Sequence, residues 1–76
     1  MLKIEILKAH SFNISKEMIE DIIEFPDKIE KGYKARLVAQ KRVDDFHVVR
    51  VVYETRIREL YVITVYPARR SRYEKD

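Results

Sequence analysis

The sequence contains no cysteine, which excludes disulfide bonds and every metal site built on thiolates. Its two histidines, His10 and His47, lie far apart along the chain, so we expect no structural zinc site, no other metal and no cofactor. A chain with one glycine, Gly32, also cannot build a glycine-rich phosphate loop. No long apolar run follows Met1, so we expect neither a signal peptide nor a membrane span, and a cytoplasmic protein.

Charge, by contrast, is abundant: charged residues of both signs make up 38% of the chain, against about 25% in an average soluble domain. Such a composition is typical of thermophile proteins, whose ion-pair networks lose less to desolvation, although a small solvated domain would also have a polar surface. Residues 1–30 carry four Lys/Arg and seven Asp/Glu, whereas residues 31–76 carry twelve and six. The basic second half predicts a surface that faces a polyanion.

The length of 76 residues predicts one small domain. A domain of this size buries only about 60% of its unfolded surface, so its core alone gives marginal stability. With disulfides and zinc excluded, we expect a dimer interface to supplement the core.

Apolar spacing predicts an α+β domain of two layers, with one helix packed on an antiparallel three- to four-strand meander sheet. Ser15 is typical of a helix N-cap, and Pro26 ends the helix because it disfavours helical geometry at Phe25. The expected elements are a strand over 2–7, a helix over 15–25, a loop over 27–33, strands over 34–43, 46–54 and 59–66, and a basic tail over 67–76 that begins where Pro67 ends the last strand.

A two-residue turn at Asp44-Asp45 would fix the register of the sheet and so the two faces of its strands. The face toward the helix would hold Ala35, Leu37, Ala39, Val43, Phe46, Val48, Val52, Tyr61, Ile63 and Val65, with Lys41 and Arg50. The second face would hold Arg36, Val38, Gln40, Arg42, His47, Val49, Val51, Tyr53, Leu60, Val62, Thr64 and Tyr66. So many valines are unfavourable in water. We therefore expect this valine-rich face to form a homodimer, to be covered by another protein, or to serve as a groove for a ligand.

Arg50 lies in the middle of a strand among aliphatic residues, where an unpaired charge would be costly. Either it pairs with an acidic side chain such as Glu24 or Asp21, or its guanidinium clamps a phosphate group. A one-residue bulge would move Arg50 to the other face.

The densest basic signal follows Pro67. Guanidinium groups match phosphate oxygens and tyrosine rings stack on bases, although a terminal basic tract is often only solvated. The candidate nucleic-acid-binding residues are Arg36, Arg42, Arg69, Arg70, Arg72, Tyr73 and Lys75. His47 could serve as a general acid or base near neutral pH, although a lone histidine on a strand is more often structural.

Several motifs together resemble a family of small prokaryotic domains of unknown function. The motifs are His10, a helix that ends at Phe25-Pro26, RVVY at 50–53, VITVYP at 62–67 and a basic run over 69–75. That family is similar to the compact RelE, ParE and BrnT toxins of toxin–antitoxin systems, so the resemblance implies a reduced RelE-like fold. This chain has one helix where those toxins usually have two, and Asn13 lies near the position where an arginine commonly follows the early histidine.

The resemblance also implies an activity, namely a metal-independent endoribonuclease that cuts mRNA and is paired with an antitoxin protein. Arg50, Arg69 and Arg70 would stabilise the charge that develops on the phosphorane. Tyr66, His47 or Tyr73 would transfer protons or stack on bases. The residues alone leave two alternatives open, a non-catalytic module that binds RNA or DNA, and a homodimeric protein-interaction module.

Overall fold

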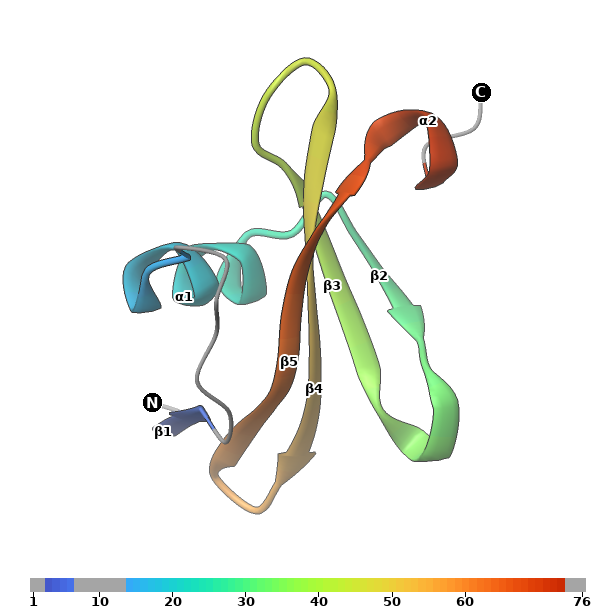
Figure 1. The fold of residues 1–76 in the computed structure, drawn as a ribbon. Coiled ribbons are helices and arrows are strands. Elements are labelled where there is room, and N and C mark those ends of the chain that lie inside the picture. Colours follow the sequence, from blue (N-terminus) through green and yellow to red (C-terminus); the bar gives the residue numbers. More distant parts are fainter. Residues whose placement is uncertain (1–2, 7–13, 74–76) are drawn as a thin grey trace.

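A five-stranded sheet is the centre of the described part of the molecule (Figure 1). In the computed structural model, which describes residues 3–6 and 14–73, the elements are β1 (Lys3–Ile6), α1 (Lys16–Glu24), β2 (Lys28–Lys31), the 3-10 turn η1 (Tyr33–Ala35), β3 (Leu37–Arg42), β4 (His47–Arg56), β5 (Glu59–Arg69) and α2 (Arg70–Tyr73). The strand order is β1-β5-β4-β3-β2, in which β2 to β5 form an antiparallel meander and β1 pairs in parallel with β5. The predicted α+β fold, one helix on an antiparallel meander, is confirmed. His10, Asn13 and Lys75 lie outside the described residues.

Helix α1 forms where the sequence predicts it, within one residue at each end. The Ser15 hydroxyl accepts a hydrogen bond from the Met18 amide at 3.1 Å, which satisfies one free donor of the first turn. At the other end the Phe25 amide donates to the carbonyl of Asp21 at 2.8 Å, and Pro26 prevents a further turn.

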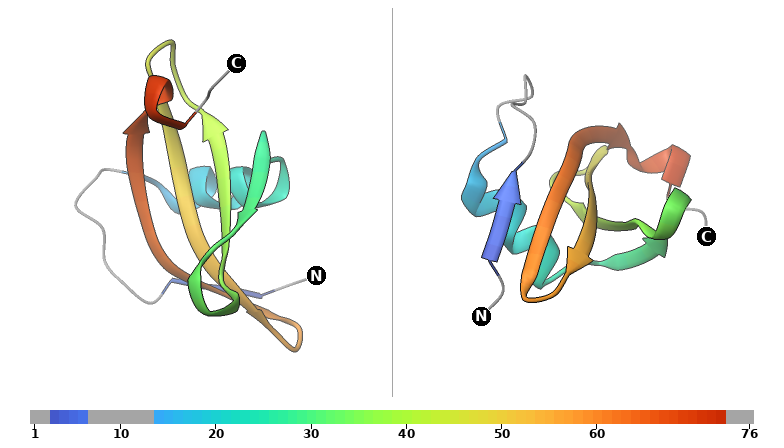
Figure 2. Two further views of the ribbon diagram at one scale, coloured as in Figure 1. Left: turned by 90° about the vertical axis from the view of Figure 1, so that its right-hand side faces the viewer. Right: turned by 90° about the horizontal axis from the view of Figure 1, so that it is seen from below.

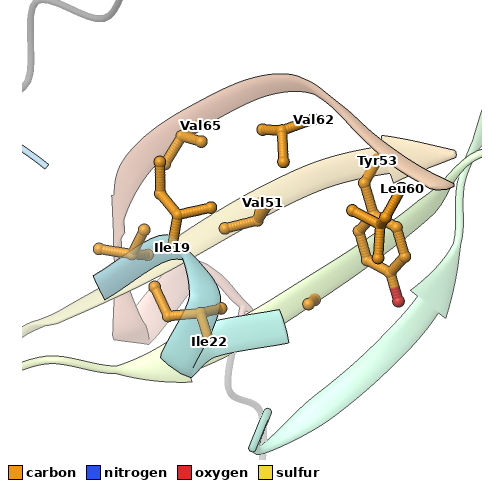
Figure 3. Packing of buried hydrophobic residues seen from close by; sticks show 9 residues of the cluster. Ile19, Ile22, Val51, Tyr53, Leu60, Val62 and Val65 are labelled. Atoms are coloured by element: carbon orange, nitrogen blue, oxygen red, sulfur yellow. The ribbon is translucent and has the colours of Figure 1, made fainter. Parts of the chain in front are cut away.

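The core lies between α1 and one face of the sheet (Figures 2 and 3). Ile19 and Ile22 are each 1% exposed and project from α1 onto the strands. Ala39, fully buried on β3, leaves room for the helix to approach, as the sequence predicts. The buried cluster consists of Ile19, Ile22, Ala39, Val49, Val51, Tyr53, Leu60, Val62 and Val65. No helix within the described parts of the chain combines the length and apolar character needed to cross a membrane.

Strand β2 corrects the loop predicted over 27–33. Residues Lys28–Lys31 pair with β3, Ile29 opposite Ala39, and all four are exposed at the edge of the sheet. An exposed edge strand of mainly charged residues gives no apolar alternation that a sequence pattern could reveal. Lys34 and Ala35 then take positive φ angles of 56° and 63° in the turn to β3, so that strand begins at residue 37 instead of 34.

The β3–β4 connection corrects the predicted register. Instead of a two-residue turn, residues 43–46 form a loop in which the Asp44 carboxylate accepts from the amides of Phe46 at 2.8 Å and His47 at 2.7 Å. Arg42 therefore pairs with Val48. Two-residue turns with Asp at both positions need positive φ angles, which the Asp44 side chain avoids by bonding the backbone itself.

This slip of one residue inverts the predicted faces of β4. Val49 and Val51 are buried in the core cluster with α1, while Val48 and Arg50 lie on the opposite face. A homodimer stays a prediction, but the buried valines 49 and 51 are not available to form its interface.

Strand β5 differs from the prediction in two further ways. Val52 of β4 pairs with Thr64, whereas the next residue, Tyr53, pairs with Val62. Ile63 is therefore an extra residue of β5 without a partner on β4, and Val62 and Val65 both reach the core. The strand also continues through Pro67, which pairs with Val49, to Arg69. Proline is tolerated there because, among the residues that the structure describes, β1 pairs with β5 only as far as Val62, which leaves an edge.

Candidate nucleic-acid interface

A hollow of about 580 Å³ lies between the β3–β4 loop and the junction of β5 with α2. Figures 1 and 2 show the loop and α2 next to each other at one end of the sheet, with α2 on the side opposite α1. We call this the basic hollow, and its lining consists of Arg42, Asp45, Phe46, His47, Arg69, Arg70 and Ser71. Three arginines around one concavity, against the single acidic residue Asp45, provide positive charge for an anionic ligand.

His47 is held at the rim of the hollow by Asp44. Its Nδ1 lies 3.0 Å and 3.1 Å from the two carboxylate oxygens, and the side chain stays about half exposed. The amide of Phe46 and the His47 ring both bond this carboxylate and hold the pKa of Asp44 below its usual value. With Nδ1 committed to Asp44, Nε2 is the ring nitrogen that can exchange a proton with a ligand.

Arg69 is the cross-strand partner of His47. Side chains at paired positions of antiparallel strands lie on one face, with Cβ atoms about 5 Å apart. The side chain of Arg69 is exposed and forms no hydrogen bond or ion pair with the rest of the described chain. A histidine of fixed orientation thus stands beside an arginine that is free to bind an anion.

Arg70 joins the loop to α2. Its amide donates to the carbonyl of Phe46 and its Nη1 donates to the carbonyl of Asp45, each at 2.8 Å. These bonds fix the walls of the basic hollow relative to each other. Arg70 is therefore a residue of the hollow with an evident structural task.

Arg50 belongs to a second, separate group of side chains, on the sheet face away from α1. It is 7% exposed, and its Nε donates to the Tyr66 hydroxyl at 2.9 Å. Its Nη1 donates to Glu30 Oε1 at 3.1 Å and to Gln40 Oε1. The guanidinium also lies 4.1 Å from the centre of the Tyr73 ring. We call Arg50, Glu30, Gln40, Tyr66 and Tyr73 the Arg50 cluster.

The ion pair expected for Arg50 is present, but Glu30 provides it instead of Glu24 or Asp21. Burial alone would lower the pKa of Arg50, but the hydrogen bonds with Tyr66 and Glu30 outweigh it and raise that pKa. Asp21 pairs instead with Lys41, at 2.7 Å. Arg50 is thus a buried, paired charge instead of an open phosphate clamp.

Lys28 extends the Arg50 cluster toward the edge of the sheet. Its Nζ donates to the carbonyl of Tyr73 at 2.9 Å and lies 3.4 Å from Glu30. The cluster therefore ties β2 and α2 to the centre of the sheet.

The structure separates the residues that the sequence suggested as one site. The basic hollow gathers His47, Arg69, Arg70 and Arg42, whereas the Arg50 cluster contains Arg50, Tyr66 and Tyr73.

Two further candidates, Arg36 and Arg72, lie outside both groups. Arg36 precedes β3, roughly 20 Å from Arg42 by the rise of an extended strand, and its Nε lies 3.7 Å from Glu54. Arg72 is exposed on α2, with its guanidinium 5.9 Å from the Tyr73 ring centre.

Phe46 and Asp44 are among the residues of the site that were not expected from the sequence. Phe46 was placed on the helix-facing side, yet it is 73% exposed at the hollow. Asp44 was taken only as a turn residue, yet it orients His47. A usable signal existed, because Asp44-Asp45 without glycine favours a longer loop that an Asp side chain caps, and such a loop keeps Phe46 out of the strand. Within the described part of the chain, no three acidic or histidine side chains are grouped to hold a metal ion.

The fold and the hollow define a small α+β domain with a basic concave site. Residues 7–67 match the model of a family described as a domain of unknown function (DUF4258), and the chain belongs to this family. Neither the curated proteins nor the solved structures that were compared include a match to the chain. Membership in a family of unknown function is what the sequence motifs predicted, and it assigns no activity.

Proposed function

We propose that the basic hollow binds RNA and cuts it as a toxin-like, metal-independent endoribonuclease. The observation that carries this proposal is the pairing of His47, held by Asp44, with the uncommitted Arg69 directly across the strands. An acid–base group and a cation on side chains whose Cβ atoms lie about 5 Å apart match the needs of phosphodiester cleavage.

The chemistry assigns one task to each residue. His47 Nε2 accepts the proton of a ribose 2′-hydroxyl, whose oxygen then attacks the adjacent phosphorus. Arg69, with Arg70 and Arg42 nearby, stabilises the additional negative charge of the phosphorane. The bond from phosphorus to the 5′ oxygen breaks and that oxygen takes a proton from solvent, which leaves a 2′,3′-cyclic phosphate and a 5′-hydroxyl.

Cleavage of a labelled RNA in the presence of a chelator tests the proposal. We expect the wild-type chain to give products with 2′,3′-cyclic phosphate ends, and His47→Ala and Arg69→Ala each to lower the rate by about 100-fold or more. Arg58→Ala is the matched control, because it also removes one exposed arginine but lies in the β4–β5 turn at the other end of the sheet. Cleavage that survives His47→Ala, or that Arg58→Ala lowers equally, would reject this site.

A cytoplasmic nuclease of this kind needs a neutralising partner, and we propose an acidic antitoxin that covers the basic hollow. The charge of the hollow supports such a partner. Expression of the chain alone is expected to arrest bacterial growth, and Arg69→Ala is expected to relieve the arrest while Arg58→Ala does not. Normal growth at full expression of the folded wild-type chain would speak against the toxin interpretation.

The alternative is a module that binds nucleic acid without cutting it. The same cations support it, since Arg69, Arg70 and Arg42 need no acid–base partner to hold phosphate groups. The cleavage assay separates the two, because a non-catalytic module retains the RNA intact on the protein.

A further inference from the structure

Phe46 is a large apolar side chain that the fold leaves in water. It is 73% exposed and lines the basic hollow, whereas Tyr53, on the following strand β4, is buried in the core. An exposed ring within a concave, charged site offers a flat apolar face to a ligand.

The loop holds Phe46 in a fixed position. Its amide donates to Asp44 Oδ1 at 2.8 Å, and its carbonyl accepts from the Arg70 amide at 2.8 Å. A backbone that is already bonded on both sides loses little further freedom when a ligand binds, so only the rotamer of the ring remains to be fixed.

The neighbours of Phe46 act at the phosphodiester in the proposed function. His47 follows it in the chain, and Arg69 lies across from His47 on β5. Proteins bind single-stranded nucleic acid with a cationic surface that follows the sugar–phosphate backbone and an aromatic ring on which a base stacks.

We infer that the basic hollow accepts an unpaired base stacked on Phe46, so that the ligand is single-stranded instead of duplex RNA. This inference rests on the proposed function for its ligand class and adds the strand state and the residue that selects it. Bases inside a duplex are already stacked on each other and present no face to a protein ring. The arginines around Phe46 favour a polyanion over an apolar protein segment as the occupant.

The test measures binding by fluorescence anisotropy, with a 2′-O-methyl oligoribonucleotide of about ten nucleotides that cannot fold on itself and cannot be cut. The same oligomer annealed to its complement is the duplex probe. Phe46→Leu keeps an apolar side chain of similar size but removes the aromatic face, and Phe46→Tyr keeps that face. Ile57→Ala is the control for loss of an exposed apolar side chain, since Ile57 is 92% exposed in the other hairpin turn.

We expect the single strand to bind more tightly than the duplex, and Phe46→Leu to weaken single-strand binding about tenfold, the effect of losing one stacked base. Phe46→Tyr and Ile57→Ala should bind as the wild-type chain does, and all variants should melt cooperatively. Equal affinity for single strand and duplex would overturn the inference, as would a Phe46→Leu variant that binds like the wild type.

This test and the cleavage assay fail separately. If the wild-type chain binds the single strand through Phe46 but does not cut RNA, the stacking site stands and the nuclease does not. If it cuts RNA but Phe46→Leu leaves binding unchanged, the nuclease stands and the stacking site does not.

Discussion

Arg50 is a buried charge whose hydrogen-bond partners come from three strands. Glu30 lies on β2, Gln40 on β3 and Tyr66 on β5. One guanidinium on β4 therefore connects all strands of the meander. A buried charge with this many partners does not need an external anion. The sequence predicted a paired Arg50 but not its partner, because the strand that contains Glu30 has no apolar pattern.

Glu30 provides a pH-dependent part of this cluster. The hydrogen bond from Arg50 lowers the pKa of Glu30, although partial burial opposes the shift. A carboxylate whose pKa falls on folding contributes stability above its unfolded pKa of about 4.3, and this contribution is lost as the pH falls through the lower folded pKa.

Glu30→Gln keeps an oxygen that accepts from Arg50 but removes the charge. We expect the variant to be less stable than the wild type near pH 7, by under about 1 kcal/mol because Glu30 is half exposed. The difference should vanish well below about pH 4. Urea denaturation of both proteins across this range measures it, and a difference that does not change with pH would show that the charge of Glu30 plays no part.

At the scale of elements, helix α1 was the most predictable part of the chain. Ser15, Pro26 and the apolar stripe that includes Ile19 and Ile22 are all local signals, and local signals decide where a helix starts, ends and faces. The register of β4 was not predictable in this way. It depends on how Asp44 bonds the backbone of its own loop, and a single residue of slip moves every side chain of the strand to the other face.

The stability of the two-layer arrangement depends on the contact between α1 and the sheet. Ile22→Ala removes a side chain that is 1% exposed, so we expect a loss of about 2–5 kcal/mol in the free energy of unfolding. Met18→Ala, on the same helix but 40% exposed, should cost much less. Chemical denaturation followed by circular dichroism gives both values, and Ile22→Val, at about 0.5–1.5 kcal/mol, remains measurable if the alanine variant does not fold. Equal losses for the Ile22 and Met18 variants would contradict the observed orientation of α1.

At the scale of the whole molecule, the fold distributes the basic residues of the second half of the chain between two places. One part, around Arg50, is buried and ties β2 and α2 to the sheet. The other part gathers at the end of the sheet, where the β3–β4 loop meets the start of α2. The sequence indicated a polyanion-binding surface but could not locate it, because Arg42 and Arg69 come to line one hollow only once β3, β4 and β5 are paired.

The most direct test of this location is nuclear magnetic resonance of the labelled chain during titration with the non-cleavable single-stranded oligoribonucleotide. Amide signals of the β3–β4 loop and of residues 68–71 should shift together and saturate together. Signals of the β4–β5 turn at Ile57 and Arg58, at the other end of the sheet, should stay in place. Shifts confined to the β4–β5 turn, or no shifts at any saturating concentration, would contradict the assignment of the basic hollow as the RNA-binding site.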